Sequence, residues 1–439
     1  MENAHSSAYG SIKNNGKSIE VKSVYIAPPS PTLKINQVMD AEEANGKEIY
    51  RLGFGGSPLP PCKELVDAYR EHLWQTSYPE IQGMLKCRQG IAKFYKKNFS
   101  INFDAEDIFV FPGSKEAIFQ ILSILEGPLL LPAPSWVSYA PQAKMIGKEV
   151  YWIETQQGND YKLTPSALKK TSELIEDKQK ILILNSPNNP VGYVYTKEEL
   201  TELASVCKEE NILVIFDGIY AHPKDFEDSP FTSMYSIYPE GCFFSGGLSK
   251  IFSCGGWRFG FIALPQNISS SKLKSALTYK MSETVSGVNL PLQYAAVSAY
   301  EANESILAYL IKVNNIYRHI TRYMWKRLTD SGLNCPKPYG AFYLFLSFDN
   351  FAASLSKHGI HDSVSLTERL RSLGIFALPG VNFGLSPSNL AIRISCTDFD
   401  GKKVLEASEG SSLDNNFIHD YTPCIKRACD AFESFLSGL

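Results

Sequence analysis

The chain has 439 residues and a formal net charge of -3, with 43 lysines and arginines against 46 acidic residues. Hydrophobic residues make up 44% and charged residues 20%, a composition typical of a globular protein large enough for two or three domains. This balance argues against a nucleic-acid-binding surface, which needs clustered Lys and Arg, and no apolar run reaches the roughly 18 residues of a membrane span.

The first residues are rich in Ser, Asn, Gly and Lys and offer few large apolar side chains to bury, so we expect a mobile tail over residues 1–24. They also lack the basic and then apolar order of a signal peptide. The nine cysteines are scattered without a Cys-x-x-Cys pair, which is typical of reduced thiols and predicts a cytoplasmic protein. His358 and His361 have no acidic or thiol neighbour in sequence, so we expect no metal site.

From residue 100 onward, strand-like apolar runs alternate with segments of helical periodicity. The first run ends at Gly113, and a helix-like segment follows from Lys115. Asn189, Asp217 and Lys250 each fall at or just past the end of a later apolar run. Uninterrupted apolar strands separated by helices indicate a mainly parallel sheet that is covered on both faces, an α/β fold. Ligands of such sheets bind beyond the carboxyl ends of the strands.

Residues 305–439 differ, because long helical patterns surround a short strand within 340–348. We expect a smaller α+β domain there and a larger domain over residues 51–304. We expect residues 25–50 to pack with the smaller domain or to bridge a dimer. The polar stretch 405–423 resembles an insertion, for which the sequence suggests no function.

Lys250 is the first candidate for chemistry. It lies in a turn of small residues, where an ammonium loses hydration and the neutral amine becomes a nucleophile toward carbonyls. Arg258 follows eight residues later, and guanidinium is a preferred partner of phosphate. The strand-to-helix junction at Gly113, Ser114 and Lys115 offers free backbone N–H groups for the same anion.

Four other residues extend this pattern. Asp217 could hold a proton on a pyridine nitrogen, while Tyr220 and Asn189 could bond a phenolic oxygen. Trp136 offers a flat apolar face on which a ring can stack. Each signal is weak alone, but their joint order along the chain indicates one ligand, a phosphorylated pyridine aldehyde.

With these residues in place, the sequence resembles a fold-type-I enzyme of the class I/II aminotransferase family, which depends on pyridoxal 5'-phosphate (PLP). The subgroup that it resembles is that of the bacterial aspartate aminotransferases. The matching strings run from residue 27 to about residue 397 and include Pro-Ser-Pro-Thr-Leu-Lys-Ile-Asn (29–36), Tyr-Pro-Glu-Ile-Gln-Gly (78–83), Gly-Ser-Lys-Glu-Ala (113–117), Pro-Ala-Pro-Ser-Trp-Val-Ser-Tyr (132–139), Asn-Ser-Pro-Asn-Asn-Pro-Val-Gly (185–192), Asp-Gly-Ile-Tyr (217–220), Gly-Trp-Arg-Phe-Gly (256–260), Gly-Ala-Phe-Tyr (340–343) and Ile-Arg-Ile-Ser (392–395).

The resemblance implies a role for each residue. Lys250 would bind the cofactor covalently and move the substrate's α-proton, and Asp217 would pair with the ring nitrogen. Tyr220 and Asn189 would hold the ring's phenolate oxygen. The other implied cofactor contacts are Gly113, Ser114, Lys115, Trp136, Ser249, Arg258 and, from the neighbouring subunit of a homodimer, Tyr78. The implied substrate contacts are Arg393, which would grip the α-carboxylate, Asn189, Trp136, Gly55, Gly56 and Thr32.

Three further details follow from the resemblance. Pro134 and Pro190 match positions that are often cis in the family. Many relatives carry serine where this chain has Gly247, although the aspartate aminotransferase subgroup also has glycine there. The usual glutamate after the ring-binding aspartate is replaced by Gly218.

The implied activity is a ping-pong transfer of an amino group between an amino acid and a 2-oxo acid. Lys115 and Thr32 match positions near the distal carboxylate of aspartate-type substrates, so we expect an aspartate or glutamate donor. In the other interpretation, Lys115 lies on the phosphate side of the cofactor or is exposed to solvent. The alternatives are an aminotransferase for an aromatic amino acid, alanine or a specialised biosynthetic substrate, and a PLP-dependent C–S lyase.

Two non-enzymatic interpretations are weaker. A ligand-sensing regulator would need an attached DNA-binding domain, and the N-terminal residues show no such pattern. A catalytically inactive scaffold is opposed by the presence of Lys250, Asp217 and Arg258.

Overall fold

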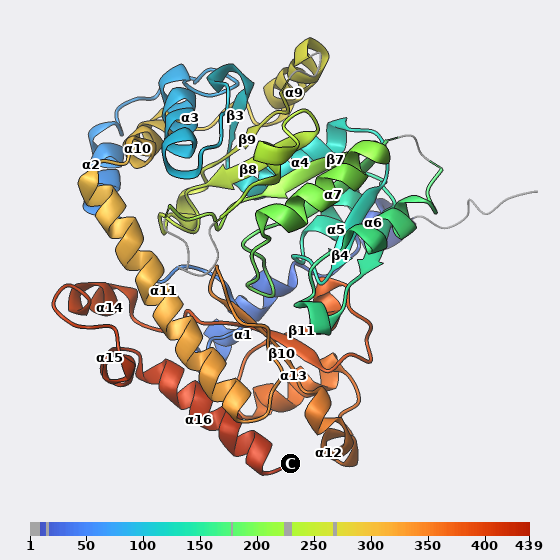
Figure 1. Cartoon of the computed structure of the whole chain (residues 1–439), viewed down its shortest axis with the longest axis vertical. Helices are drawn as coiled ribbons and strands as arrows, with labels where there is room; N and C mark the ends of the chain where they lie inside the picture. The colour runs from blue at the N-terminus through green and yellow to red at the C-terminus, as the bar shows by residue number, and fades with distance from the viewer. Residues whose placement is uncertain (1–8, 15–16, 177–178, 224–230, 267–269) are drawn as a thin grey trace, which may run out of the picture.

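The computed structural model describes residues 9–14, 17–176, 179–223, 231–266 and 270–439. Its larger part is built on a seven-stranded sheet, and its smaller part on a three-stranded sheet, with the long helix α11 (Glu304–Asp330) running alongside both (Figure 1). The larger part contains β3 (Ile108–Phe111), β4 (Leu129–Ala133), β5 (Val150–Glu154), β6 (Lys180–Asn185), β7 (Ile212–Asp217), β8 (Cys242–Gly247) and β9 (Gly260–Ala263).

The strand order of this sheet is β3-β9-β8-β7-β6-β4-β5. The strands from β8 to β5 are parallel to their neighbours, whereas β9 is antiparallel to both β8 and β3. The predicted α/β fold with a mainly parallel sheet is therefore confirmed. The reversal at β9 was not predicted, because a buried strand has the same apolar pattern in either direction.

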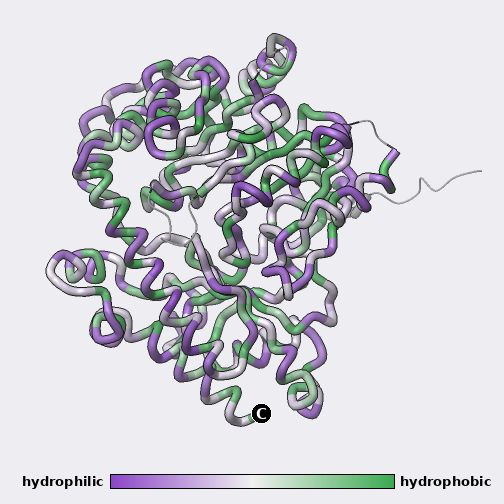
Figure 2. Tube along the Cα trace, viewed as in Figure 1, coloured by the Kyte–Doolittle hydropathy of each residue, from purple (hydrophilic) through white to green (hydrophobic). Residues whose placement is uncertain are grey.

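Both faces of the sheet are covered. On β6, Ile181 and Ile183 belong to one buried cluster and Leu182 and Leu184 to another, because successive side chains of a strand point to opposite faces. Figure 2 shows the hydrophobic residues gathered along these central strands. The helices of the larger part are α2 (Lys63–Glu71), α3 (Leu85–Phe99), α4 (Ser114–Ile124), α5 (Tyr139–Met145), α6 (Pro165–Ser172), α7 (Lys197–Glu209), α8 (Met234–Ile237), α9 (Ser270–Thr284) and α10 (Leu290–Glu301).

The smaller sheet has the antiparallel order β10-β12-β11, with β10 (Tyr343–Ser347), β11 (Leu378–Pro379) and β12 (Ala391–Ser395). The element over residues 340–348 was predicted, whereas the strands β11 and β12 were not. The helices around this sheet are α1 (Pro31–Ala44), α11, α12 (Ala352–Lys357), α13 (Ser363–Ser372), α14 (Gly401–Ala407), α15 (Asn415–Tyr421) and α16 (Pro423–Ser437).

Residues 25–50 contact this smaller part. Glu42 of α1 forms an ion pair of 2.8 Å with Arg371, and Tyr50 forms a parallel bridge with Ile375. The domain boundary at residue 305 remains a proposal. It coincides with the start of α11, which links the two sheets.

The N-terminal segment gives a different result from the one expected. Residues 1–8 and 15–16 lie outside the described residues, and the chain between and after them forms an antiparallel hairpin of β1 (Tyr9–Asn14) and β2 (Lys17–Lys22). Composition did not predict this pairing, because backbone hydrogen bonds of a hairpin do not need apolar side chains. In the described part of the chain, no helix is both long enough and apolar enough to cross a membrane.

Candidate active site

The site lies at the carboxyl edge of the parallel strands. Asn185, Asp217 and Ser245 end or nearly end β6, β7 and β8, and the strand register places them side by side. The chain that leaves these strands carries Asn189 after β6 and Lys250 after β8. Parallel strands present their carboxyl ends at one edge, so residues separated by dozens of positions in sequence meet there.

Asp217 is a buried carboxylate that has hydrogen bonds but forms no ion pair with another described residue. Its Oδ2 accepts from the Tyr139 hydroxyl at 2.7 Å, and its Oδ1 accepts from the Ile219 backbone N–H at 3.3 Å. Burial raises the pKa of Asp217 to about 6, although these bonds and the charge of Lys250 oppose the shift. A cationic N–H placed next to this carboxylate would keep it ionised.

The Lys250 amine lies among aromatic rings. Its Nζ donates to the Gly55 carbonyl at 2.7 Å and is 5.5 Å from the ring centroids of Tyr220 and Phe342. The Tyr220 hydroxyl is 2.9 Å from that of Tyr343, and burial raises the pKa of Tyr220 well above its usual value. Tyr220 therefore stays protonated at neutral pH and can donate a hydrogen bond.

Two backbone segments approach closely where β3 leads into α4. Gly113 precedes α4 with φ at 99°, and a Cβ there would lie 2.2 Å from Nη2 of Arg258. A Cβ on Gly260 would lie 2.2 Å from the backbone nitrogen of Ser114. Glycine at both positions lets the free N–H groups at the start of α4 lie beside the guanidinium of Arg258, an arrangement suited to a phosphate.

Positive charge accumulates at this junction. The pKa of Lys115 is lowered, first by burial and then by the charges of Arg258 and Lys250. None of the ion pairs found across the described residues involves these three side chains. The Nζ of Lys115 also lies 5.1 Å from the ring centroid of Trp136. Three cations that form no ion pair with a carboxylate of the described residues are suited to an anionic ligand.

Arg393 is the other cation of the site. It is 1% exposed, donating from Nη1 to Oδ1 of Asn189 at 3.2 Å and from Nη2 to the Gly53 carbonyl at 2.7 Å. The guanidinium lies 4.6 Å from the ring centroid of Tyr343. Its Nε is buried and has no hydrogen-bond partner within the described structure, and burial lowers its pKa. A buried guanidinium without a protein counter-ion is suited to a ligand carboxylate.

Several predicted residues are not joined to this cluster. Thr32 lies at the start of α1, and its hydroxyl is 3.0 Å from that of Ser30. Tyr78 is 92% exposed, and no side-chain contact found among the described residues joins it to the cluster. Gly56 and Ser249 are half-buried next to Gly55 and Lys250 in sequence, but no side-chain contact ties them to the cluster in the part described.

The two departures from the family pattern have packing reasons. A Cβ on Gly247 would lie 2.6 Å from the carbonyl of Phe259, which directly precedes the paired strand β9, so a serine would displace this backbone. A Cβ on Gly218 would lie 2.4 Å from a ring atom of Phe244, so this ring fills the space that a glutamate would enter.

One expectation about the backbone is half right. The Ala133–Pro134 bond is cis as expected, but the second cis bond is Ser186–Pro187 rather than the bond before Pro190. Pro190 lies in a turn closed by a bond of 2.9 Å from the Gly192 N–H to the Asn188 carbonyl, and the sharp bend after β6 comes earlier, at Ser186.

The sequence analysis missed two buried tyrosines. Tyr139 bonds Asp217, and Tyr343 bonds Tyr220 and flanks Arg393. Both tyrosines end strings that carry the family resemblance, 132–139 and 340–343, and that position was the available signal.

Comparisons with known proteins agree with this arrangement. Residues 48–409 match the family model described as aminotransferase class I and II. The aspartate aminotransferase of Bacillus subtilis is 29% identical over 380 residues, which cover 84% of this chain and 93% of that protein. A protein of Rickettsia conorii named "Probable aspartate/prephenate aminotransferase" is 31% identical, with 81% of this chain and 89% of that protein covered.

Solved structures share the fold. The aspartate aminotransferase of Thermus thermophilus with maleate aligns with a TM-score of 0.79 at 24% identity, covering 94% of this chain and 98% of that one. The aromatic aminotransferase of Pyrococcus horikoshii aligns with a TM-score of 0.75 at 26% identity, covering 91% and 99% of the two chains.

Proposed function

Because the chain belongs to the class I and II aminotransferases, a PLP-dependent family of enzymes, we propose that it binds PLP at Lys250 and transfers an amino group between an amino acid and a 2-oxo acid. The single observation that carries the proposal is that a half-buried amine and a buried carboxylate lie near each other at one edge of the sheet. Lys250 and Asp217 lie close enough for their charges to interact.

The residues present fit this cofactor. Arg258, with the N–H group of Ser114 at the start of α4, would hold the phosphate, whereas the Gly113 N–H already donates to the Phe111 carbonyl at 2.7 Å. Asp217 would accept from the protonated ring nitrogen, and its carboxylate would thereby stay ionised. When bound, PLP supplies an aldehyde that carries the amino group and a ring that withdraws electrons from the substrate.

The protein's own groups would then manage protons and orientation. The Lys250 amine would act as the general base and acid at the substrate α-carbon. Oδ1 of Asn189 accepts from Arg393, which leaves its Nδ2 to donate toward a ring oxygen, as the protonated Tyr220 hydroxyl can also do. Arg393 would bind the α-carboxylate and so orient the α-proton toward Lys250.

For the substrate we propose aspartate or glutamate as the amino donor. The relatives of Bacillus and Thermus carry the name aspartate aminotransferase, and Lys115 supplies a partly buried cation for a second carboxylate. An aromatic or prephenate-type partner is the second candidate, because other relatives are named for those substrates.

We also propose a homodimer in which Tyr78 reaches the site of the neighbouring subunit. Tyr78 is 92% exposed, and Leu73 and Trp74 close by are 58% and 72% exposed. Large apolar side chains that share an exposed segment are typical of a protein interface. The cytoplasmic location stays a prediction.

The test is an absorbance titration of the purified protein with PLP, followed by half-reactions with a panel of amino acids. We expect a visible absorption band that aspartate or glutamate converts at least tenfold faster than aromatic or cationic donors. A protein that takes up no PLP would contradict the cofactor proposal. Pyruvate and ammonia released without an oxo-acid acceptor would instead indicate the lyase alternative.

A further inference from the structure

A cavity lies between α11, α15 and α16. Figure 1 shows these three helices on the smaller part of the molecule. Its volume is about 650 Å³, within the range of small-molecule pockets. None of the residues of the candidate active site lines it. Six basic side chains do, namely His319, Arg322, Lys326, Arg327, His419 and Lys426.

Part of this cavity comes from the segment for which the sequence suggested no function. His419 belongs to α15, which lies inside the polar stretch 405–423, and Lys426 follows on α16. Both lie beyond residue 409, where the match to the aminotransferase family model ends. The cavity is therefore not built from the matched family core alone.

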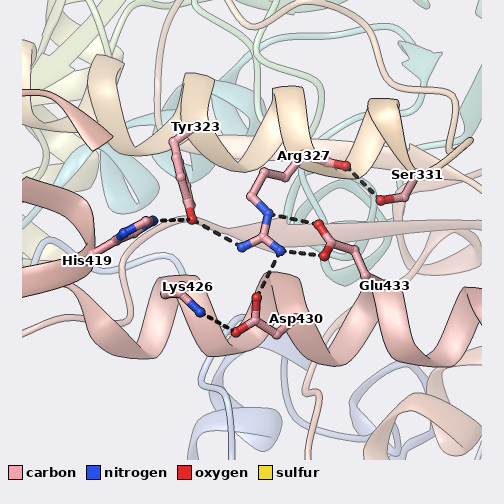
Figure 3. A network of polar contacts seen from close by, with 7 residues as sticks. All are labelled: Tyr323, Arg327, Ser331, His419, Lys426, Asp430 and Glu433. Atoms are coloured by element: carbon pink, nitrogen blue, oxygen red, sulfur yellow. Dashed lines mark hydrogen bonds and ion pairs between the residues drawn. The ribbon is translucent and has the colours of Figure 1, made fainter. Parts of the chain in front are cut away.

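Arg327 ties the walls of the cavity together. Its Nε donates to Glu433 at 2.8 Å, its Nη2 to Asp430 at 2.8 Å and its Nη1 to the Tyr323 hydroxyl at 3.1 Å (Figure 3). These bonds join α11 to α16. Arg327 is thus saturated by protein partners and serves to hold the cavity open rather than to bind a ligand.

The charges of Lys326 and Lys426 are less fully neutralised by protein carboxylates than that of Arg327. Asp430, which already accepts from Arg327, is also the partner of Lys426 at 2.8 Å, so one carboxylate is shared by two cations. Lys326 pairs with Asp330 at 2.8 Å on the same helix, but both side chains are mostly exposed and such pairs are weak. Both ammonium groups can therefore leave these partners and bind a ligand that carries more negative charge.

The balance of the lining is positive. Four arginine and lysine side chains, two carboxylates and two histidines line the cavity, and Glu433 adds a third carboxylate as the partner of Arg327. The Nε2 atom of His319 is buried and has no hydrogen-bond partner among the described residues. The lining contains no aliphatic residue, and its polar atoms come mainly from charged side chains.

From this geometry we propose that the cavity binds a small multivalent anion, a phosphorylated or polycarboxylate metabolite, held chiefly by Lys326 and Lys426. The site stands apart from the proposed aminotransferase chemistry. The helix α11 nevertheless reaches both the cavity and the candidate active site. Tyr317 on this helix donates to the Ser57 hydroxyl at 2.6 Å and packs on Phe342, whose ring lies beside Lys250. A bound anion would thus contact a helix that reaches the candidate active site.

The test is calorimetric titration of the PLP-saturated protein with inorganic pyrophosphate, tricarballylate and acetate at one ionic strength. We expect saturable binding of pyrophosphate or tricarballylate with Kd below about 1 mM, and none of acetate. The tighter of the two identifies phosphate or carboxylate as the ligand chemistry.

Two double variants make the result specific to the cavity. Lys326→Gln with Lys426→Gln should weaken binding at least tenfold. Lys197→Gln with Lys357→Gln removes the same charge from exposed positions outside the cavity and should leave Kd unchanged. Absorbance of the bound PLP should be the same in all variants, which separates this proposal from that for the active site. Equal weakening in both double variants, or no saturable binding at all, would overturn the proposal.

Discussion

The hydroxyl of Tyr139 donates a hydrogen bond of 2.7 Å to Oδ2 of Asp217, and both side chains are buried. The bond favours the ionised carboxylate against the burial that raises the pKa of Asp217 to about 6. Without this donor, less opposes the rise in the pKa of Asp217 that burial causes. In Tyr139→Phe, we therefore expect the pKa of Asp217 to rise further above 6.

The measurement is unfolding of the cofactor-free protein in urea over a pH series. The pKa of Asp217 is higher in the folded than in the unfolded protein. Its contribution to the free energy of unfolding is therefore fully present below about pH 4 and is lost as the pH rises through about 6. In Tyr139→Phe this loss should extend to higher pH. Tyr300→Phe is the control, since the buried Tyr300 hydroxyl has no partner in the described structure. An identical pH profile in wild type and Tyr139→Phe would disprove the effect.

Lys250→Ala should keep PLP binding and lose turnover by several orders of magnitude. The phosphate and ring contacts proposed here do not use the amine, whereas the α-proton transfer does. PLP uptake is read from absorbance, and turnover from transamination with the best donor. Near-normal turnover in this variant would rule out Lys250 as the general base.

Lys115→Gln separates the two interpretations of this side chain. If Lys115 binds the distal carboxylate, kcat/KM for aspartate should fall about tenfold relative to alanine, a difference of about 1.4 kcal/mol. If it serves the phosphate, the Kd of PLP should rise while the preference between donors stays constant. Lys144→Gln, an exposed lysine on α5, is the matched control.

Gly247→Ala should lower the free energy of unfolding by about 1–3 kcal/mol, because the new Cβ meets the backbone of Phe259 and Gly260 at the start of β9. Gly256→Ala adds the same atom where no atom lies within 4 Å, and we expect a change within about 0.5 kcal/mol. Urea unfolding measures both variants. Equal stability of the two would show that β9 can shift to accept a side chain.

Local patterns of the sequence were enough to predict the mainly parallel sheet and to place Asp217 and Lys250 at or just beyond strand ends. These features depend on short apolar runs and on the turn residues that follow them, which are local properties of the chain. The family strings likewise pointed to Arg258 and to the junction at Gly113, because the residues of each string are adjacent in sequence.

Which side chains meet became clear from the three-dimensional structure alone. Tyr139 and Asp217 form a hydrogen bond although they are 78 positions apart in the sequence, and Arg393 and Asn189 do so over 204 positions. Arg393 lies on β12, a strand that the sequence did not predict. The cavity between α11, α15 and α16 is of the same kind, since its walls come from helices separated in the chain. Such contacts depend on strand order and helix packing, and the periodicity of a single segment carries no information about its distant neighbour.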